Sequence, residues 1–187
     1  MLRSTQLSAL TTTQLGALGG DQLAALTTTQ LGWFRATQLG ALTSLQFEAL
    51  TASRFAVLGP AQIAGLTTTQ LVDQLPELTT TQIGALGTAQ IRALAATDLG
   101  TLTTTQLSGL RSTQLAVLDT AQLGFLDAGR IGVLSPVQVT GFAAIQIAAF
   151  TTAQIGGLTV GQIAVLATTQ IAALATAQLG SLSPGQA

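Results

Sequence analysis

Apolar residues recur along the chain with a period of eight and define a repeating unit. A large aliphatic or aromatic residue follows nearly every Gln, and a Leu or Phe stands four residues after most of them. The two positions between hold small residues, and Thr is common before the Gln. The consensus is L-T-T-T-Q-L-G-A, as in "LTTTQLGAL" at 10–18. Self-similarity at a fixed short period indicates a repeat architecture.

The Gln residues mark the register, because every Gln in the chain lies on it. Arg54, Asp98 and Arg130 stand where a Gln is expected, and one step of four residues separates Gln70 from Gln74. Gln occupies positions 6, 14, 22, 30, 38, 46, 62, 70, 74, 82, 90, 106, 114, 122, 138, 146, 154, 162, 170, 178 and 186.

Three structures compete for this pattern. A single long helix is excluded, because eight residues turn through roughly 800° and the apolar stripe drifts by about 80° per unit. A β-solenoid suits Thr, Ile and Val, but Leu residues three apart point to opposite faces of a flat strand. Leu, Ala and Gln favour helix. We therefore expect an all-α solenoid with one very short helix per octad, and a β-solenoid is the alternative.

Each octad carries two signals for the start of a helix. With Thr11 as N-cap, Gln14 is the third helical residue, and the two form a T-x-x-Q capping box. Leu10 and Leu15 then occupy the two positions of a hydrophobic staple.

The exceptions agree with this interpretation. Pro60, Pro136 and Pro184 all fall at the first helical position, where the missing amide proton of proline costs nothing. Ser, Asp and Gly are accepted N-caps, whereas Ala and Arg are poorer. The cap positions without Thr are Gly19, Gly59, Gly87, Asp119, Asp127, Ser135 and Ser183, then Ala at 95, 143, 167 and 175, and Arg at 3, 35 and 111.

Such short helices are unstable alone in water, so stacked coils must bury their apolar positions. The similar segments 50–63 and 126–139 are separated by the four-residue insert plus nine octads. Nine is a multiple of three, so we expect three repeats per coil, with two as the alternative. Residues 1–187 then form a single octapeptide-repeat solenoid, in which Gly and Ala allow close approach.

The four-residue irregularity lies near 71–77. It adds about one helical turn, and Leu71, Leu75 and Leu78 would share one face of a helix. Pro76 disfavours a clean extension. We expect an irregular, longer unit there.

Composition excludes several kinds of chemistry. The chain has no Cys and no His, which excludes disulfides, thiolate or imidazole metal sites, Cys nucleophiles and His general bases. A net charge of −1 indicates no basic surface for nucleic acid, and 4% aromatic residues leave few rings for bases to stack on. No apolar run is long enough for a membrane span, and "MLRSTQLSAL" has no signal-peptide pattern. We expect no enzymatic activity, no cofactor and no metal.

The Gln and Thr columns have structural interpretations beside functional ones. A Gln column can serve as a ligand ladder, but capping explains both its residue type and its spacing. Regular Thr columns are typical of ice-binding solenoids, although here Thr becomes sparse after residue 112. N-cap preference explains Thr equally well.

The few charged and aromatic candidates are scattered. Asp119 and Asp127 are eight residues apart, but they suit N-caps, and a calcium site needs several oxygens in one loop. Trp33 is expected in the core or at the end of a coil, with an exposed position as the alternative. Glu48 and Glu77 carry no motif. Five Arg residues could form a polar strip, but we expect them to lie on the solvated surface: Arg35, Arg54, Arg92, Arg111 and Arg130.

The tandem T-T-x-Q-[LI]-x-x-L octads resemble repeat tracts in very large bacterial exoproteins described as adhesin-like or as haem-utilisation or adhesion proteins. The resemblance covers essentially the whole chain and implies an extracellular or cell-surface setting and a structural role. It transfers no binding residue, and the absence of His and the single Met disfavour a haem-ligand role.

We expect a non-catalytic structural solenoid that serves as a spacer or scaffold segment of a secreted or cell-surface bacterial repeat protein. One alternative is a protein-binding or self-associating module, because open solenoid ends expose apolar surface and stack end to end. A homo-oligomer formed through these ends is the one partner that the sequence suggests. The other alternative is an ice-binding protein.

Overall fold

The computed structural model describes residues 2–187, except for the side chain of Ala52. These residues form 22 α-helices of four to six residues, one 3-10 helix and no strand. The all-α prediction is therefore confirmed. The chain divides into two compact units, Met1–Gln90 and Ile91–Ala187, and each is described by itself. The expectation of a single domain over 1–187 stays a prediction.

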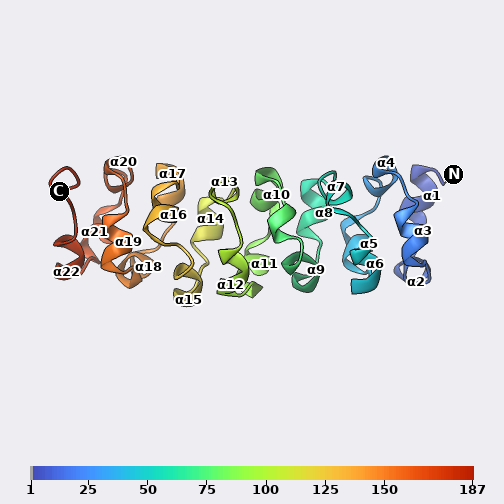
Figure 1. Cartoon of the computed structure of the whole chain (residues 1–187), viewed down its shortest axis with the longest axis horizontal. Helices are drawn as coiled ribbons and strands as arrows, with labels where there is room; N and C mark the ends of the chain where they lie inside the picture. Colours follow the sequence, from blue (N-terminus) through green and yellow to red (C-terminus); the bar gives the residue numbers. More distant parts are fainter. Residues whose placement is uncertain (1) are drawn as a thin grey trace. The chain divides into compact units, whose positions relative to one another are not determined.

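Helices follow one another at the spacing of the octads (Figure 1). The first unit contains α1 (Ser4–Ala9), α2 (Thr12–Gly16), α3 (Gly20–Ala24), α4 (Thr28–Leu31), α5 (Ala36–Gly40), α6 (Ser44–Glu48), α7 (Ala52–Phe55), α8 (Pro60–Ala64), α9 (Thr68–Val72), η1 (Leu75–Glu77) and α10 (Thr80–Ala85). Helix α11 (Thr88–Ala93) includes the boundary between the units. The second unit contains α12 (Ala96–Gly100), α13 (Thr104–Leu107), α14 (Ser112–Leu115), α15 (Thr120–Leu123), α16 (Ala128–Gly132), α17 (Pro136–Val139), α18 (Ala144–Ala149), α19 (Thr152–Gly156), α20 (Val160–Ile163), α21 (Thr168–Ala172) and α22 (Thr176–Leu179).

The helices start where the octads predict. Pro60 and Pro136 are the first residues of α8 and α17, as expected. Pro184 occupies the same place in a single turn that is not continued into a helix. Gln186 still accepts a hydrogen bond from the backbone N–H of Ser183 at 2.7 Å there, so the capping geometry persists in the absence of a helix.

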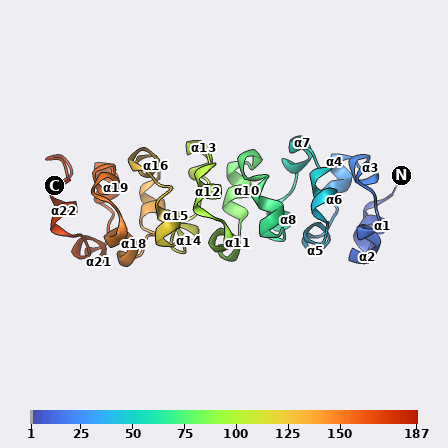
Figure 2. The same ribbon diagram turned by 60° about the horizontal axis from the view of Figure 1, so that its bottom comes forward.

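Each coil contains three repeats, because helices three places apart in the chain lie against each other. This holds for α2 with α5 and α3 with α6 in the first unit, and for α12 with α15 and α16 with α19 in the second. Figure 2 shows α16 and α19 side by side, as does Figure 1. Three consecutive octads therefore make one coil. The three-repeat prediction is confirmed and the two-repeat alternative is wrong.

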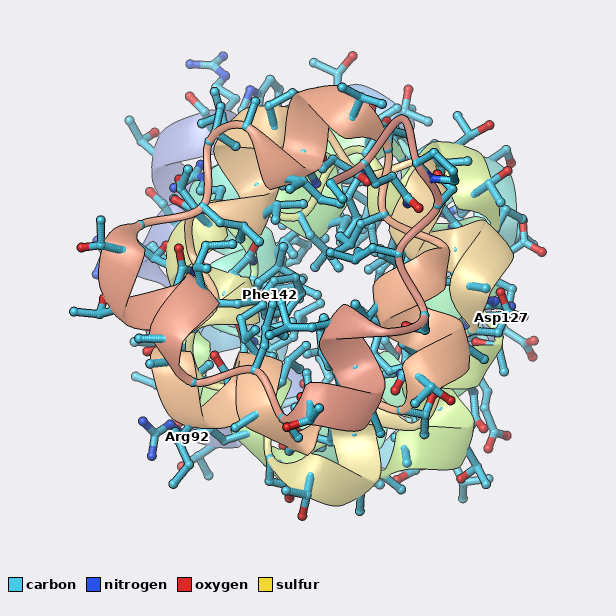
Figure 3. All side chains as sticks on the ribbon, turned by 90° about the vertical axis from the view of Figure 1, so that its left-hand side faces the viewer. Arg92, Asp127 and Phe142 are labelled. Atoms are coloured by element: carbon cyan, nitrogen blue, oxygen red, sulfur yellow. The ribbon has the colours of Figure 1, made fainter. Side chains whose placement is uncertain are left out.

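Within each unit, the core is a column of Leu, Ile and Phe enclosed by the coils. The residue after each Gln is almost completely buried in the interior coils, as at Leu115 (0% exposed) and Ile147 (0%). Figure 3 shows Phe142 inside the ring of helices, whereas Arg92 and Asp127 lie on the outside. Phe142 packs edge to face against Phe150, with ring centroids 5.1 Å apart. The amphipathic pattern of the octad thus becomes an inside and an outside.

The four-residue step shortens a coil instead of lengthening a helix. Helix α9 ends at Val72, and η1 takes up a complete side of the coil, so that α10 packs on α8. Leu75 and Leu78 remain buried, at 0% and 3% exposure. The segment "QLPEL" at 74–78 therefore keeps the two core positions of an octad and lacks the capping residues before the Gln.

The prediction of a longer unit near 71–77 is wrong. The count of nine octads, on which the prediction of three repeats per coil was based, is also wrong. Because η1 counts as a side, the segments 50–63 and 126–139 are separated by ten sides, not nine. Ten is not a multiple of three. The prediction of three repeats was correct, but the duplication did not justify it.

Small residues allow the coils to approach. A Cβ added at Gly141 would overlap the backbone of Ser112, and one at Gly157 would lie 2.6 Å from the carbonyl oxygen of Ala128. None of the described glycines has a positive φ. These two glycines are therefore required for space between coils and not for backbone freedom.

Candidate functional site

The repeated Gln is the most regular polar feature of the molecule, and its oxygen caps the helix to which it belongs. In α18, the Gln146 Oε1 accepts a hydrogen bond from the N–H of Ala143, the N-cap residue, at 2.7 Å. The same contact forms where the N-cap is Thr, Asp, Ser, Gly, Ala or Arg, as at Gly59 (2.9 Å) and Arg35 (2.8 Å). The Gln half of the capping box therefore does not depend on a side-chain oxygen at the cap.

The nitrogen of the same amide bonds to the preceding coil, a role that sequence reasoning missed. Gln146 Nε2 donates to the carbonyl oxygens of Leu115 at 2.9 Å and Leu118 at 2.8 Å, 31 and 28 residues earlier. Both offsets recur at Gln38, Gln46, Gln62, Gln70, Gln122, Gln138, Gln154, Gln162 and Gln178. The Gln column is thus a ladder of cross-coil hydrogen bonds.

The shortened coil moves these bonds by four residues. Gln82 donates to Phe55 and Leu58, which are 27 and 24 residues earlier. Gln90 likewise donates to Ile63 and Leu66 at these offsets. Cross-coil bonding therefore follows the stacking of sides and not a fixed distance along the chain.

These bonds satisfy the ends of two helices with one side chain. The last carbonyls of an α-helix have no partner within the helix, and no described residue adopts the positive φ that commonly ends helices. The Gln amide instead donates both of its protons to carbonyls of the coil below and accepts the N-cap proton of its own helix. Most of the interior Gln residues are buried, as expected for fully bonded amides.

Gln suits this position because its side-chain amide both accepts and donates hydrogen bonds. Glu has an oxygen for the N-cap but no donor for the two carbonyls, and a buried carboxylate facing them is strongly unfavourable. Asp98 shows the acceptor half alone, because its Oδ2 accepts from the N–H of Ala95 at 2.9 Å.

Arg54 and Arg130 show the donor half. Their guanidinium groups donate to Leu23 O at 3.2 Å and to Gly100 O at 2.8 Å, respectively. Both side chains are half-buried, so the expectation of solvated surface is wrong for these two. Arg130 Nη1 is buried and has no hydrogen-bond partner. The other three Arg candidates, Arg35, Arg92 and Arg111, are exposed as expected.

The Thr column at the N-cap position caps the helices in the structure. Thr11 Oγ1 accepts from the N–H of Gln14 at 3.2 Å, and Thr151 Oγ1 accepts from the N–H of Gln154 at 3.2 Å. Asp119 and Asp127 cap α15 and α16 in the same way, at 2.7 Å and 2.8 Å. The capping interpretation of these side chains is confirmed.

The remaining sequence candidates do not converge. Trp33 is 36% exposed, whereas its neighbour Phe34 is 4% exposed, so Phe34 and not Trp33 fills the core position. The core expectation for Trp33 is wrong. Glu48 and Glu77 are both exposed. Within residues 2–187, no group of three or more Asp and Glu residues is arranged to hold a metal ion.

Of two hollows on the surface, one is small and the other is bordered by side chains that already make hydrogen bonds. One of ≈ 30 Å³ is bordered by Glu48 and Asp73, a volume for about one water molecule. Another, of ≈ 260 Å³, lies beside Asp127 and Thr151. Asp127 Oδ1 and Thr151 Oγ1 already accept helix-capping hydrogen bonds.

Among the described helices, none has the length and apolar character that crossing a membrane requires.

Comparison with known proteins finds one family. Residues 1–28 match the family model described as the ALTTAQ repeat, so this part of the chain is similar to a known repeat tract. A search of curated proteins finds no match.

Proposed function

We propose that the chain is a non-catalytic structural solenoid, a rigid spacer or scaffold segment of a secreted or cell-surface bacterial repeat protein. The observation that carries the proposal is the Gln ladder, in which the most regular polar side chain of the repeat bonds to backbone groups on two coils. Most Thr, Ser and Asp residues at cap positions are likewise committed to helix starts. A repeat whose polar residues are used in this way is suited to building length and stiffness.

Further support comes from the regular stacking of coils. Each additional coil of three octads repeats the same core and the same cross-coil bonds, so length grows by a constant increment. The similarity of residues 1–28 to a repeat family agrees with a structural role. The surface or secreted setting rests on the resemblance of the octads to exoprotein repeat tracts.

Stiffness within the second unit tests the spacer role. Spin labels on cysteines introduced as Thr120→Cys and Thr176→Cys, both exposed positions, report a distance within that unit. We expect a narrow distance distribution that shifts to a shorter distance when residues 135–158, one complete coil, are deleted. A broad distribution in the parent protein would contradict a rigid spacer.

Location is tested separately in the source cells. An antiserum against this chain is expected to label the cell surface or the culture medium. Retention of all the antigen inside intact cells would contradict the proposed setting and leave the spacer role to the distance measurement.

A further inference from the structure

Four exposed side chains gather where α4 passes into α5 and, one coil later, where α7 passes into α8. Trp33 is 36% exposed and Val57 is 44% exposed, and Arg35 and Pro60 are exposed as well. Gln62 fixes the two turns to each other, because its Nε2 donates to carbonyl oxygens before and after Trp33 at 2.9 Å and 2.8 Å. We call these four side chains the Trp corner.

The Trp corner combines apolar surface with positive charge. Residues 27–42 and 51–66, which form its helices and turns, contain no Asp or Glu. Arg35 is the N-cap of α5, but its guanidinium group makes no hydrogen bond or ion pair within the described residues. Trp and Arg are enriched in protein interfaces and among the residues that dominate binding energy. The corner is therefore suited to a partner that carries carboxylates beside apolar surface.

The opposite flank of the same coils is acidic. Because α4, α5 and α6 make one coil, the corner between α4 and α5 lies across the core from α6, which packs on α9. Glu48 and Asp73 are exposed beside the small hollow that these two helices border, and neither carboxylate makes a hydrogen bond or ion pair within the described residues. Leu45 on α6 is 78% exposed. We call Leu45, Glu48 and Asp73 the acidic flank.

The Trp corner and the acidic flank have complementary chemistry but cannot meet within one molecule. Both belong to the first unit, and they face away from each other on the second and third coils. Residues 43–50 and 67–78, which form the acidic flank, contain no Arg or Lys. A second copy of this chain, placed alongside, therefore supplies what each surface lacks.

We propose that the protein self-associates side by side, with the Trp corner of one copy docked on the acidic flank of the next. Arg35 then pairs with Glu48 and Asp73 through charge-assisted hydrogen bonds, and Trp33 covers Leu45. Such an interface is heterologous, so it generates an open series of oligomers instead of a closed dimer. The proposal is independent of the spacer role, because a spacer can also work as a monomer.

The test uses sedimentation velocity of the full 187-residue chain over the micromolar to submillimolar range. A corner variant carries Arg35→Glu, a flank variant carries Glu48→Arg and Asp73→Arg, and a reversed variant carries all three changes. The control Arg111→Glu changes an exposed N-cap Arg of the second unit, where Gly109 stands in place of a Trp.

We expect the parent and the control to form oligomers of increasing size as concentration rises. The corner and flank variants are expected to associate at least tenfold more weakly, because each brings like charges together. The reversed variant is expected to associate as the parent does, since opposite charges meet again with their signs exchanged.

Fluorescence locates the contact, because Trp33 is the single Trp of a chain without Tyr. Its emission is expected to shift to shorter wavelength as the parent associates and to stay constant in the corner variant. Association of the parent without this shift would place the interface elsewhere and overturn the proposal.

A parent that stays monomeric over the whole range also overturns it. So does a corner variant that associates as strongly as the parent, or a reversed variant that remains as weak as the flank variant. Circular dichroism verifies that each variant keeps its helices. If Arg35→Glu unfolds, Arg35→Ala replaces it, because Ala also occupies N-cap positions such as Ala143, and it is expected to weaken association in the same direction.

Discussion

At the scale of the residue, one amide connects two levels of structure. Gln146 closes the start of α18 and bonds to two carbonyls of the preceding coil, and only a side chain with both an acceptor and two donors does this. Gln14 makes the capping contact alone. Comparing the two positions separates the capping role from the cross-coil role.

Gln146→Glu is expected to destabilise the fold by about 2–4 kcal/mol, because a buried carboxylate then faces two carbonyl oxygens. The same change at the exposed Gln14 is expected to cost less than about 0.5 kcal/mol, since Glu also suits a capping box. Urea unfolding of both variants measures the difference. Equal losses at the two positions would show that the cross-coil bonds contribute nothing.

The pH dependence of the free energy of unfolding of the Gln146→Glu variant gives a second test of the buried position. Burial raises the folded-state pKa of the introduced carboxyl above its unfolded value, so its protonated form favours the folded state. The loss of stability is therefore expected to be smallest below the unfolded pKa and to grow as pH rises through the folded pKa. A loss that does not change with pH would contradict a buried carboxylate at this site.

Arg130 is an imperfect substitute for Gln, because it donates one hydrogen bond to Gly100 O and leaves Nη1 buried without a partner. Arg130→Gln is expected to raise the free energy of unfolding by about 1 kcal/mol, since it restores an acceptor for the cap and removes a buried unpaired donor. The control Arg92→Gln changes an exposed side chain and is expected to be neutral. The prediction fails if both variants have the parent's urea midpoint.

At the scale of the element, short helices are stable because the neighbouring coils are close. Gly141 shows how close, because the backbone of Ser112 occupies the space where a Cβ would lie. Gly16, inside α2, has no atom within 4 Å of that space. The same substitution is therefore expected to have opposite effects at the two positions.

Gly141→Ala is expected to destabilise the protein by about 1–3 kcal/mol through overlap between coils. Gly16→Ala is expected to stabilise it by about 0.5–1 kcal/mol, because Ala is the better helix former. Thermal unfolding of the two variants gives the signs. Stabilisation by Gly141→Ala would show that the coils lie farther apart than in this structure.

At the scale of the whole molecule, the sequence predicted the elements better than their assembly. The capping box of Thr11 and Gln14 lies within one octad, so local rules were sufficient to predict the helix and its start. The cross-coil bonds join residues 31 and 28 positions apart. Because the local capping box already explains the Gln, the motif gives no reason to expect a second partner for it 28 or 31 residues away.

Two signals in the sequence pointed to the missing role. The capping-box rule accepts Glu as well as Gln, yet no Glu stands at this position. Arg replaces Gln at 54 and 130, although Arg has no acceptor for a cap. Both facts indicate that a donor is favoured at this position, which only Asp98 lacks. The half-octad at 74–78 was misjudged because Leu71, Leu75 and Leu78 also fit the spacing of a longer helix.

Disulfide formation tests most directly the claim that coils of three repeats stack on one another. A Cβ at Gly20 lies 3.5 Å from the Cβ of Ala49, which is within the range that a disulfide accepts. The chain has no Cys of its own, so a pair introduced at Gly20→Cys and Ala49→Cys is unambiguous. Ala41, one octad before Ala49, is the C-cap of α5, which packs on α2 instead of α3.

We expect rapid, complete intramolecular oxidation of the Gly20→Cys, Ala49→Cys pair in the folded protein, seen as protection from alkylation in the intact mass. We expect no oxidation of the Gly20→Cys, Ala41→Cys pair. Oxidation of the second pair but not the first would indicate coils of two repeats and contradict the stacking of three-repeat coils.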